Sequence, residues 1–343
     1  MHIHSNKSTV IDTVKVNTSA RLHMGFFDLS SANNNFGSKF GGLGLAIDAP
    51  CTQITIAKSQ KTLIDAKSND NFAEIVENIV KTLNLKHHFS LTINQSIPVH
   101  AGLGSGTQMA LAIGTGINHL FGLQLSISQI AVAAMRGKRS GIGIGAFEQG
   151  GFLVDTGKLD TGKLDVEKLA EALPKIAMRQ DFPEDWRVLL VQDSAHIGVH
   201  GALESQAFNT LKVAQGSLRA MVFEHMIPAM QRADLSAFGA YMQELQAYNG
   251  AYFAPIQGGH YASQDAGNVL NWLQQNGASC VGQSSWGPTC FAVLQSQQQA
   301  ETLLQQAQLV FNSKPNISFQ IVHGKNSGAT IDILEDCILE GNI

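Results

Sequence analysis

Residues 97–112 read Ile97-Pro-Val-His-Ala-Gly-Leu-Gly-Ser-Gly-Thr-Gln-Met-Ala-Leu-Ala112, a glycine-rich turn between the end of an expected strand and the start of an expected helix. Because glycine has no side chain, backbone N–H groups can converge there, and the helix N-terminus adds a partial positive charge. The turn therefore predicts an anion site, with a phosphate or pyrophosphate as its natural occupant. The phosphate-binding residues expected in it are Gly102, Leu103, Gly104, Ser105, Gly106 and Thr107.

Two common nucleotide motifs do not describe this turn, and a plain tight turn is the structural alternative. No G-K-[ST] follows as in a Walker A loop, and Thr107 occupies the third glycine position of a Rossmann turn. A second stretch, Gly141-Ile-Gly-Ile-Gly-Ala146, has the dinucleotide spacing but follows a helix and a basic turn where a strand is required. A dinucleotide site is therefore rejected.

Strand-like and helix-like patterns alternate through the first part of the chain. β-branched residues at period two predict strands, and apolar residues at helical spacing from Phe72 to Leu83 predict a helix that packs on the sheet. The expected elements are strands 13–19 and 52–58, helix 72–83, strand 89–94, helices 107–121 and 128–136, and strand 151–155. A connector with one short helix is expected over 156–184.

The patterns beyond this connector predict a second domain. Its expected elements are strand 187–192, helices 204–219 and 223–245, strand 290–294, a helix through 295–308, and strands 317–322 and 330–334. This order indicates an α/β sandwich with helices on one face of a mainly antiparallel sheet. A single core stops growing at roughly 250–300 residues. The chain of 343 residues is accordingly divided into domains 1–185 and 186–343.

Composition excludes several classes of partner. Lys and Arg number 23 and Asp and Glu 27, a net charge of −4, so the chain lacks the basic character of nucleic-acid-binding proteins. No membrane segment or signal peptide is expected. The four cysteines form no C-x-x-C pair, which favours reduced thiols and a cytoplasmic location.

Several blocks of sequence carry a family resemblance. The turn from Pro98 to Thr107 and the segment Ser284-Ser-Trp-Gly-Pro-Thr-Cys-Phe-Ala-Val293 resemble motifs of the GHMP kinase superfamily. Four further blocks, at 19–29, 40–48, 139–152 and 252–259, resemble the β-ribofuranosylaminobenzene 5′-phosphate synthase family. The resemblance implies a two-domain α+β GHMP-kinase-like fold, with an N-terminal ribosomal-S5-domain-2-like α/β domain and a C-terminal ferredoxin-like α/β sandwich.

The resemblance also implies an activity. The family condenses phosphoribosyl pyrophosphate with 4-aminobenzoate or 4-hydroxybenzoate, releases CO2 and pyrophosphate, and serves tetrahydromethanopterin biosynthesis. Mg²⁺ is the expected cofactor and a homodimer the expected assembly. An ATP-dependent GHMP kinase and a non-catalytic ligand-binding protein of this fold are the alternatives. The kinase is disfavoured because Ser140-Gly-Ile-Gly143 lacks the Asp of the kinase P-S-G-x-D segment.

The predicted catalytic residues are Arg21, His23, Asp28, Arg139, Glu148 and Asp193. Arg21 and His23 follow a strand and can clamp a carboxylate or phosphate, or form an ion pair and a satisfied histidine. Asp28 can cap its loop or bind a metal. Arg139 and Glu148 flank the second glycine run and suit an anion or metal site or a structural ion pair. Thr107 and Glu148 are the candidate Mg²⁺ ligands.

Further residues are predicted to bind substrate. Lys39 can close over pyrophosphate or lie in solvent. The expected substrate-binding residues are Ser285, Trp286, Gly287, His196 and Glu204. Aromatic residues beside the family blocks can stack on a benzoate ring or belong to the core; they are Phe26, Phe27, Phe40, Tyr252, Phe253 and Trp286. The segment 285–289 predicts a second wall of a cleft between the domains.

Overall fold

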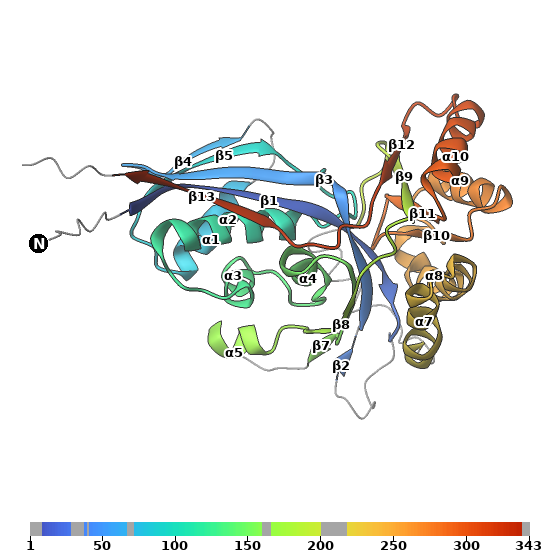
Figure 1. The fold of residues 1–343 in the computed structure, drawn as a ribbon, viewed down its shortest axis with the longest axis horizontal. Coiled ribbons are helices and arrows are strands. Elements are labelled where there is room, and N and C mark those ends of the chain that lie inside the picture. Colours follow the sequence, from blue (N-terminus) through green and yellow to red (C-terminus); the bar gives the residue numbers. More distant parts are fainter. Residues whose placement is uncertain are drawn as a thin grey trace, which may run out of the picture.

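The computed structural model describes residues 9–28, 38–39, 41–66, 72–159, 166–199 and 218–337 (Figure 1). Two sheets organise these residues into an α+β protein. The first belongs mainly to the N-terminal half and the second to the C-terminal half.

The first sheet has seven strands among the described residues. Their order is β13-β1-β3-β5-β4, with β6 paired to β3 and β8 paired to β6. The strands are β1 (Thr9–Phe26), β3 (Gly42–Lys58), β4 (Leu63–Ala66), β5 (Phe89–Gln95), β6 (Phe152–Asp155), β8 (Ile176–Gln180) and β13 (Thr330–Cys337). All pairs are antiparallel except β4 with β5. A short ribbon joins β2 (Ser38–Lys39) to β7 (Lys158–Leu159).

Helices cover one face of this sheet. They are α1 (Phe72–Thr82), α2 (Ser105–Phe121), α3 (Ile127–Ala133) and α4 (Ile142–Glu148), and α5 (Val166–Glu171) lies against α3. Apolar residues of α1 and α2, such as Ile79 and Ile113, form one core with Val16 and Ile56 of the sheet. Helical spacing places the buried residues of α1 on a single face, whereas α2 is buried on all sides from Gln108 to Ile117.

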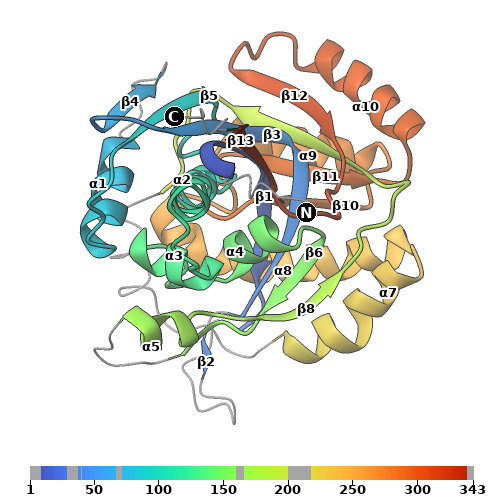
Figure 2. The same cartoon turned by 60° about the vertical axis from the view of Figure 1, so that its left-hand side comes forward.

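The second sheet is antiparallel and has the order β10-β11-β9-β12. Its strands are β9 (Arg187–Asp193), β10 (Cys280–Gln283), β11 (Cys290–Leu294) and β12 (Ile317–Val322). The helical elements around it are the π-helical turn η1 (Met221–Met226), α7 (Ile227–Gln231), α8 (Leu235–Gln257), α9 (Gln264–Gln275) and α10 (Gln297–Val310). Figure 2 shows α10 beside β12.

Both faces of the second sheet are covered, whereas helices on one face were predicted. Leu189 and Val191 of β9 face α9 and α10, and Val188 and Leu190 face the core that contains α8. This alternation follows from the two-residue period of a strand. The core that contains α8 also includes Leu22 and other residues of β1, so this core joins the two halves of the chain.

The last strand crosses the predicted domain boundary. β13 pairs with β1 in the first sheet, with Val14 opposite Ile333 and Val16 opposite Ile331. The division at 185/186 therefore needs a correction, because Thr330–Cys337 complete the N-terminal sheet. Sequence patterns place a strand here but do not identify its partner.

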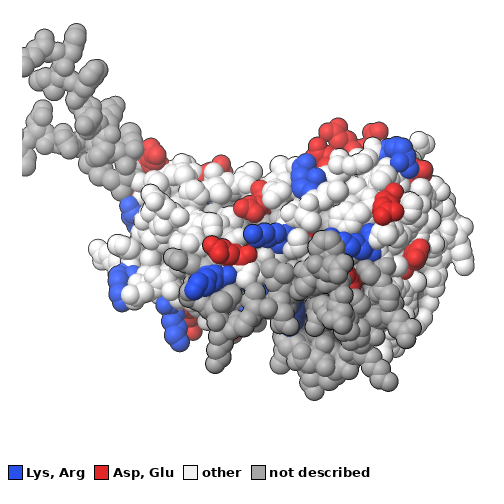
Figure 3. Space-filling model, turned by 90° about the horizontal axis from the view of Figure 1, so that it is seen from below, with Lys and Arg blue, Asp and Glu red and all other residues white. Residues whose placement is uncertain are grey.

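Several other elements differ from the predictions. The second glycine run forms helix α4, and β8, α9 and β10 were not predicted. The expected helix at 204–219 lies mostly outside the described residues. In the part of the chain that the structure describes, no helix is long and apolar enough to cross a membrane. Figure 3 shows acidic and basic side chains interspersed on the described surface of one face.

Candidate functional site

The glycine turn lies directly before α2, where it forms part of a cleft. Gly102 and Gly104 have φ values of 78° and 82°, and Gly104 immediately precedes the helix. A Cβ atom at Gly102 would lie 2.6 Å from the Ser284 carbonyl oxygen, so a larger residue does not fit. Since the first N–H groups of a helix lack partners within it, this turn presents hydrogen-bond donors to a ligand.

Arg21 of β1 stabilises the glycine turn by hydrogen bonds. Its Nη1 donates to the Gly102 carbonyl oxygen at 2.7 Å, and its backbone N–H donates to Leu103 at 3.1 Å. The guanidinium lies against Gly104, where a Cβ would be 3.1 Å from Cζ of Arg21. The pairing of β1 with β3 shifts register between Ser19 and Arg21, and such a bulge redirects a side chain at the edge of a site.

The second domain provides the opposite wall. The Ser284 hydroxyl donates to the Gly102 carbonyl at 2.7 Å and accepts from the His23 N–H at 3.0 Å. The Ser285 N–H donates to the His23 carbonyl at 2.9 Å, and the Gly198 N–H donates to His100 at 3.1 Å. These bonds hold three loops of the chain together around the turn.

The cleft between these loops has a volume of about 690 Å³. It runs from the glycine turn to Phe72 and Glu74 of α1 and to Arg136 after α3. A cavity of this size lies within the usual range of small-molecule binding sites.

Arg136 is a cleft residue that the sequence analysis noted only as part of a basic turn. A Cβ at Gly106 would lie 3.5 Å from its Cζ, so the guanidinium sits at the N-terminus of α2. Burial lowers its pKa, and Glu74 partly opposes this effect. Its Nε has no hydrogen-bond partner among the described residues. Because Arg stays protonated in proteins, a second cation reaches the anion site.

The structure brings most of the loop residues predicted for the site together. The predicted residues that line the cleft are Arg21, Gly102, Gly104, Ser105, Gly106, Thr107, Ser285, Trp286 and Gly287. Leu103 points into the core. His23 lies behind this cleft, in a small pocket that shares Ser285 and Trp286 with it. Phe26 and Phe253 lie there too, whereas Phe27 belongs to the core.

Asp193 and His196 form a structural network outside the cleft lining. Asp193 is buried and accepts hydrogen bonds from the Ser263 hydroxyl at 2.6 Å and the Ala195 N–H at 2.9 Å. Its Oδ2 lies 2.7 Å from Nδ1 of the exposed His196. Burial alone would raise the pKa of Asp193, but these hydrogen bonds hold it below its ordinary value. Because Ser263 caps α9, the network fixes the start of that helix.

Three other predicted catalytic residues do not line the cleft. Asp28 is buried just after β1, and Arg139 is half-buried in the turn before α4. Glu148 is exposed at the C-terminal end of α4, whereas Gly143 at the other end packs on Thr107. The two candidate Mg²⁺ ligands, Thr107 and Glu148, are thus not brought together.

Three predicted residues have no described side chain. Lys39 lies in β2, and only its backbone is described. Glu204 lies outside the described residues, as does Phe40. Their predicted roles stay predictions.

Gly143, at the position of the kinase carboxylate, is packed closely against Thr107. Gly143 stands where the P-S-G-x-D segment has its Asp, and a Cβ there would lie 2.9 Å from Cγ2 of Thr107. The Gly143 carbonyl also accepts a hydrogen bond from Gln108 at 2.8 Å. A carboxylate at this position would require Thr107 to move.

Asp155 is a buried carboxylate that the sequence analysis did not select. It accepts hydrogen bonds from the Ser140 hydroxyl at 2.6 Å and from the N–H groups of Gly42, Gly141 and Gly157 at 2.7–3.0 Å. Burial raises its pKa to about 6, although the hydrogen bonds oppose this. The carboxylate ties β6 to β3 and to the start of α4 behind the site.

The two sheets and the glycine turn before α2 define a protein of the GHMP kinase class. Residues 71–151 match the family of GHMP kinases N terminal domains, and residues 226–313 match the family described as GHMP kinases C terminal. A homoserine kinase from Cytophaga hutchinsonii has the same fold, with a TM-score of 0.63 and 18% identity over 97% of this chain and 100% of that one.

Within this class, the similarity of whole chains identifies the family. A β-ribofuranosylphenol 5′-phosphate synthase from Methanocaldococcus jannaschii is 32% identical over 81% of this chain and 88% of its own length. The enzyme of that name from Methanothermobacter thermautotrophicus is 28% identical over 81% and 88%. The chain belongs to the β-ribofuranosylphenol 5′-phosphate synthase family, which confirms the resemblance found in its motifs.

Proposed function

We propose that this protein is a decarboxylating phosphoribosyltransferase that joins phosphoribosyl pyrophosphate to a para-substituted benzoate. The observation that carries the proposal is the anion cleft of Arg21, Arg136 and the glycine turn in a chain of this family. The product is a β-ribofuranosyl-benzene 5′-phosphate, and we place the reaction in tetrahydromethanopterin biosynthesis. The names of the relatives specify a ribosylated phenol. This supports 4-hydroxybenzoate as the acceptor, because a phenol product retains the ring hydroxyl.

The cleft suits a donor with several phosphate groups. The N-terminus of α2 and the Arg136 guanidinium lie side by side and favour the pyrophosphate. Arg21 supports the turn through Gly102 and keeps its cation in the same lining. Fixed positive groups around a leaving group stabilise the charge that develops as it departs.

The reaction exchanges one carbon–oxygen bond and one carbon–carbon bond for a new carbon–carbon bond. The anomeric C–O bond breaks, and its electron pair leaves with pyrophosphate. The ring carbon that bears the carboxylate bonds to the anomeric carbon. The bond to the carboxylate then breaks, CO2 departs, and its electron pair restores the aromatic ring. No net proton transfer is needed, so the reaction requires neither a general acid nor a general base.

Mg²⁺ fits this cleft mainly as a partner of the pyrophosphate. Oxygen donors of the type it prefers line the cleft at Ser105, Thr107 and Glu74. No group of three His, Cys, Asp or Glu side chains that could hold a metal occurs in the described ranges. When bound, the ion would neutralise charge on the leaving group. Thr107 and Glu74 are the residues we expect to contact it.

The test is to incubate the full chain with Mg²⁺, phosphoribosyl pyrophosphate and carboxyl-labelled 4-hydroxybenzoate or 4-aminobenzoate. We expect labelled CO2 and pyrophosphate in equal amounts. Arg21→Ala should lower kcat/KM at least tenfold, since a charge-assisted contact contributes roughly 1.5–3 kcal/mol. Arg232→Ala, at an exposed arginine after α7, is the control and should keep full activity. Release of neither product by the unaltered protein would reject the proposal.

A further inference from the structure

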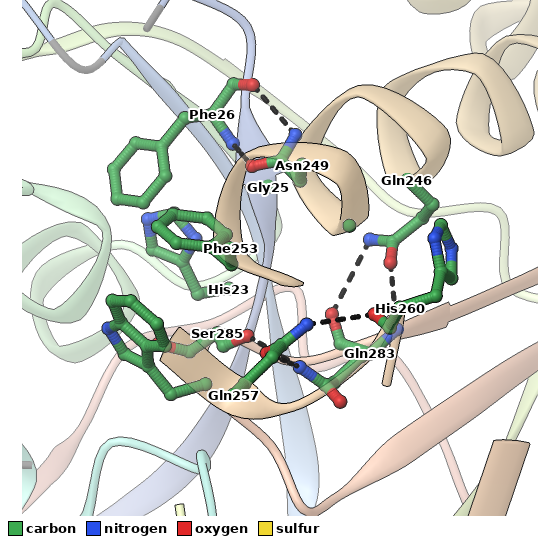
Figure 4. A pocket seen from close by; sticks show the side chains of 12 residues that line it. His23, Gly25, Phe26, Gln246, Asn249, Phe253, Gln257, His260, Gln283 and Ser285 are labelled. Atoms are coloured by element: carbon green, nitrogen blue, oxygen red, sulfur yellow. Dashed lines mark hydrogen bonds between the residues drawn. The ribbon is translucent and has the colours of Figure 1, made fainter. Parts of the chain in front are cut away.

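A second cavity lies directly behind the cleft wall at Ser285 and Trp286 (Figure 4). Its volume is about 20 Å³, which is room for a single water-sized group. Figure 4 shows His23, Phe26 and Phe253 on one side and the glutamines of α8 and β10 on the other. The two cavities share two lining residues, so the pocket directly adjoins the cleft.

The amide side chains of the pocket are already occupied by the protein's own groups. Gln246 Nε2 donates to the carbonyl oxygens of Met24 and Gln283, at 2.7 and 3.4 Å. Asn249 Nδ2 donates to Phe26 and Leu245, both at 2.8 Å.

Two further glutamines repeat this arrangement. Gln257 Nε2 donates to the carbonyls of Gly259 and His260, and Gln283 Nε2 donates to Gln257 Oε1 and the Ser285 carbonyl. These contacts make a fixed wall in which both N–H donors of each amide are used.

His23 is different, because its ring has no polar partner. The residue is 4% exposed, and neither Nδ1 nor Nε2 makes a hydrogen bond within the described part of the chain. Burial and the positive charge of Arg21 lower its pKa to about 3, so the ring is neutral at physiological pH. A neutral imidazole offers one donor and one acceptor. Leaving both unused in a buried position is unfavourable, which points to an occupant of the pocket.

Three aromatic residues line the pocket together with this histidine: Phe26, Phe253 and Trp286. The ring centroid of His23 lies 4.4 Å from that of Phe26, and the Phe253 and Trp286 centroids are also 4.4 Å apart. Together they provide apolar surface for an aromatic ligand, with His23 as the polar group that a small substituent can reach.

We propose that the His23 pocket binds the para substituent of the benzoate acceptor, with the benzoate ring against Trp286 and its carboxylate-bearing carbon in the cleft. This inference rests on the proposed function and assigns His23 as its specificity-determining residue. A para substituent lies opposite the reacting carbon, so a ring that stacks on Trp286 with its reacting carbon in the cleft directs this substituent toward the adjoining pocket. The pocket admits hydroxyl or amino and excludes larger groups.

The test measures dissociation constants by calorimetry, because binding is independent of the effect of the substituent on ring reactivity. The ligands are 4-hydroxybenzoate, 4-aminobenzoate, 4-methylbenzoate and 4-methoxybenzoate. Methyl has about the size of hydroxyl but forms no hydrogen bond, and methoxy is too large. The unaltered protein should bind the hydroxyl or amino compound at least tenfold more tightly than the methyl compound, and the methoxy compound more weakly still.

Variants then isolate the contribution of the histidine. His23→Phe should abolish the preference for hydroxyl over methyl, whereas His23→Gln should retain part of it. His87→Phe, at an exposed histidine of the first domain, is the control and should retain it fully. The Kd of phosphoribosyl pyrophosphate should change less than twofold in all three. A cycle in which residue 23 and the para substituent are changed separately and together gives the coupling free energy between them.

Equal affinity of the unaltered protein for hydroxyl and methyl compounds would overturn the assignment, as would an unchanged preference in a folded His23→Phe protein. If His23→Phe does not fold, the ligand series on the unaltered protein decides alone. Turnover of phosphoribosyl pyrophosphate in the same preparation separates the two proposals. Product formation without the substituent preference overturns only the pocket, and absence of both product and benzoate binding overturns both.

Discussion

Two guanidinium groups reach the same cleft from different elements, and their surroundings give them different tasks. Arg21 donates to the Gly102 carbonyl and thereby supports the turn. Arg136 lies at the N-terminus of α2, with Nε unpartnered among the described residues. We therefore expect Arg21 to organise the phosphate loop and Arg136 to contact the anion itself.

This difference predicts the effect of replacing Arg136. Arg136→Ala should raise the KM for phosphoribosyl pyrophosphate about 10- to 100-fold, the loss of one charge-assisted hydrogen bond of roughly 1.5–3 kcal/mol. Arg136→Lys should recover part of it, because Lys keeps the charge but not the planar fork. Lys138→Ala, at an exposed position of the same turn, is the matched control. Steady-state kinetics decides the matter, and an unchanged KM in Arg136→Ala would remove this residue from the anion site.

At the scale of elements, one carboxylate joins β6, β3 and α4. Protonation of Asp155 occurs in the folded protein near pH 6, above the ordinary value of 3.8. The folded state thus holds a proton that the unfolded state releases between about pH 4 and 6. The contribution of this carboxyl to the free energy of unfolding falls as pH rises through that window, by roughly 3 kcal/mol, and is constant above it.

Urea unfolding of the unaltered protein and of the Asp155→Asn variant tests the direction of this pH dependence. The stability of the unaltered protein relative to the variant should decrease from pH 4 to 6 and level off above pH 7. Asp65→Asn, at an exposed carboxyl of β4, should leave the pH dependence unchanged. The burial effect would be contradicted if the free energy of unfolding of the unaltered protein, minus that of Asp155→Asn, increased with pH.

Periodic elements could be predicted from the sequence, and those stabilised by distant contacts could not. The helix from Phe72 was evident because its apolar residues repeat at helical spacing. Helix α4 was missed, since Gly141-Ile-Gly-Ile-Gly has low helix propensity and depends on Ile142 packing against β3 and β6. Strand β8 was missed because half-buried residues give it no clear alternation.

The residues of the candidate site also divide into those with a local sequence pattern and those placed only by distant contacts. The glycine turn was found because its backbone conformation requires glycine, as at Gly102. Arg136 and the amides of α8 were missed, since an Arg in a short basic turn and scattered Gln and Asn resemble solvent-exposed residues in the sequence. Asp193 and His196 show the reverse case, because polar residues after a strand can also bind the capping residue of a helix, as Asp193 binds Ser263.

At the scale of the whole molecule, the two predicted domains share structure. β13 returns to the first sheet, and Leu22 of β1 shares a core with Trp186, Leu190 and Phe291 of the second half. A core common to both halves couples their stabilities, because opening it exposes apolar surface on each side.

We therefore expect the chain to unfold as one cooperative unit. All three tryptophans, Trp186, Trp272 and Trp286, lie in the second half, so their fluorescence reports on that half. Circular dichroism reports on both. The urea midpoints measured by the two methods should coincide, which is the standard indication of a two-state transition.

A core substitution in the first half gives the decisive measurement. Ile79→Ala removes a fully buried side chain from α1, in a core that contains no tryptophan. The substitution should lower the free energy of unfolding by about 2–5 kcal/mol. If the halves are coupled, the fluorescence midpoint falls together with the midpoint from circular dichroism. Leu22→Ala, in the shared core, is the positive control. A fluorescence midpoint unchanged by Ile79→Ala would mean that the shared core does not transmit stability, and that the cleft lies between two independently folding units.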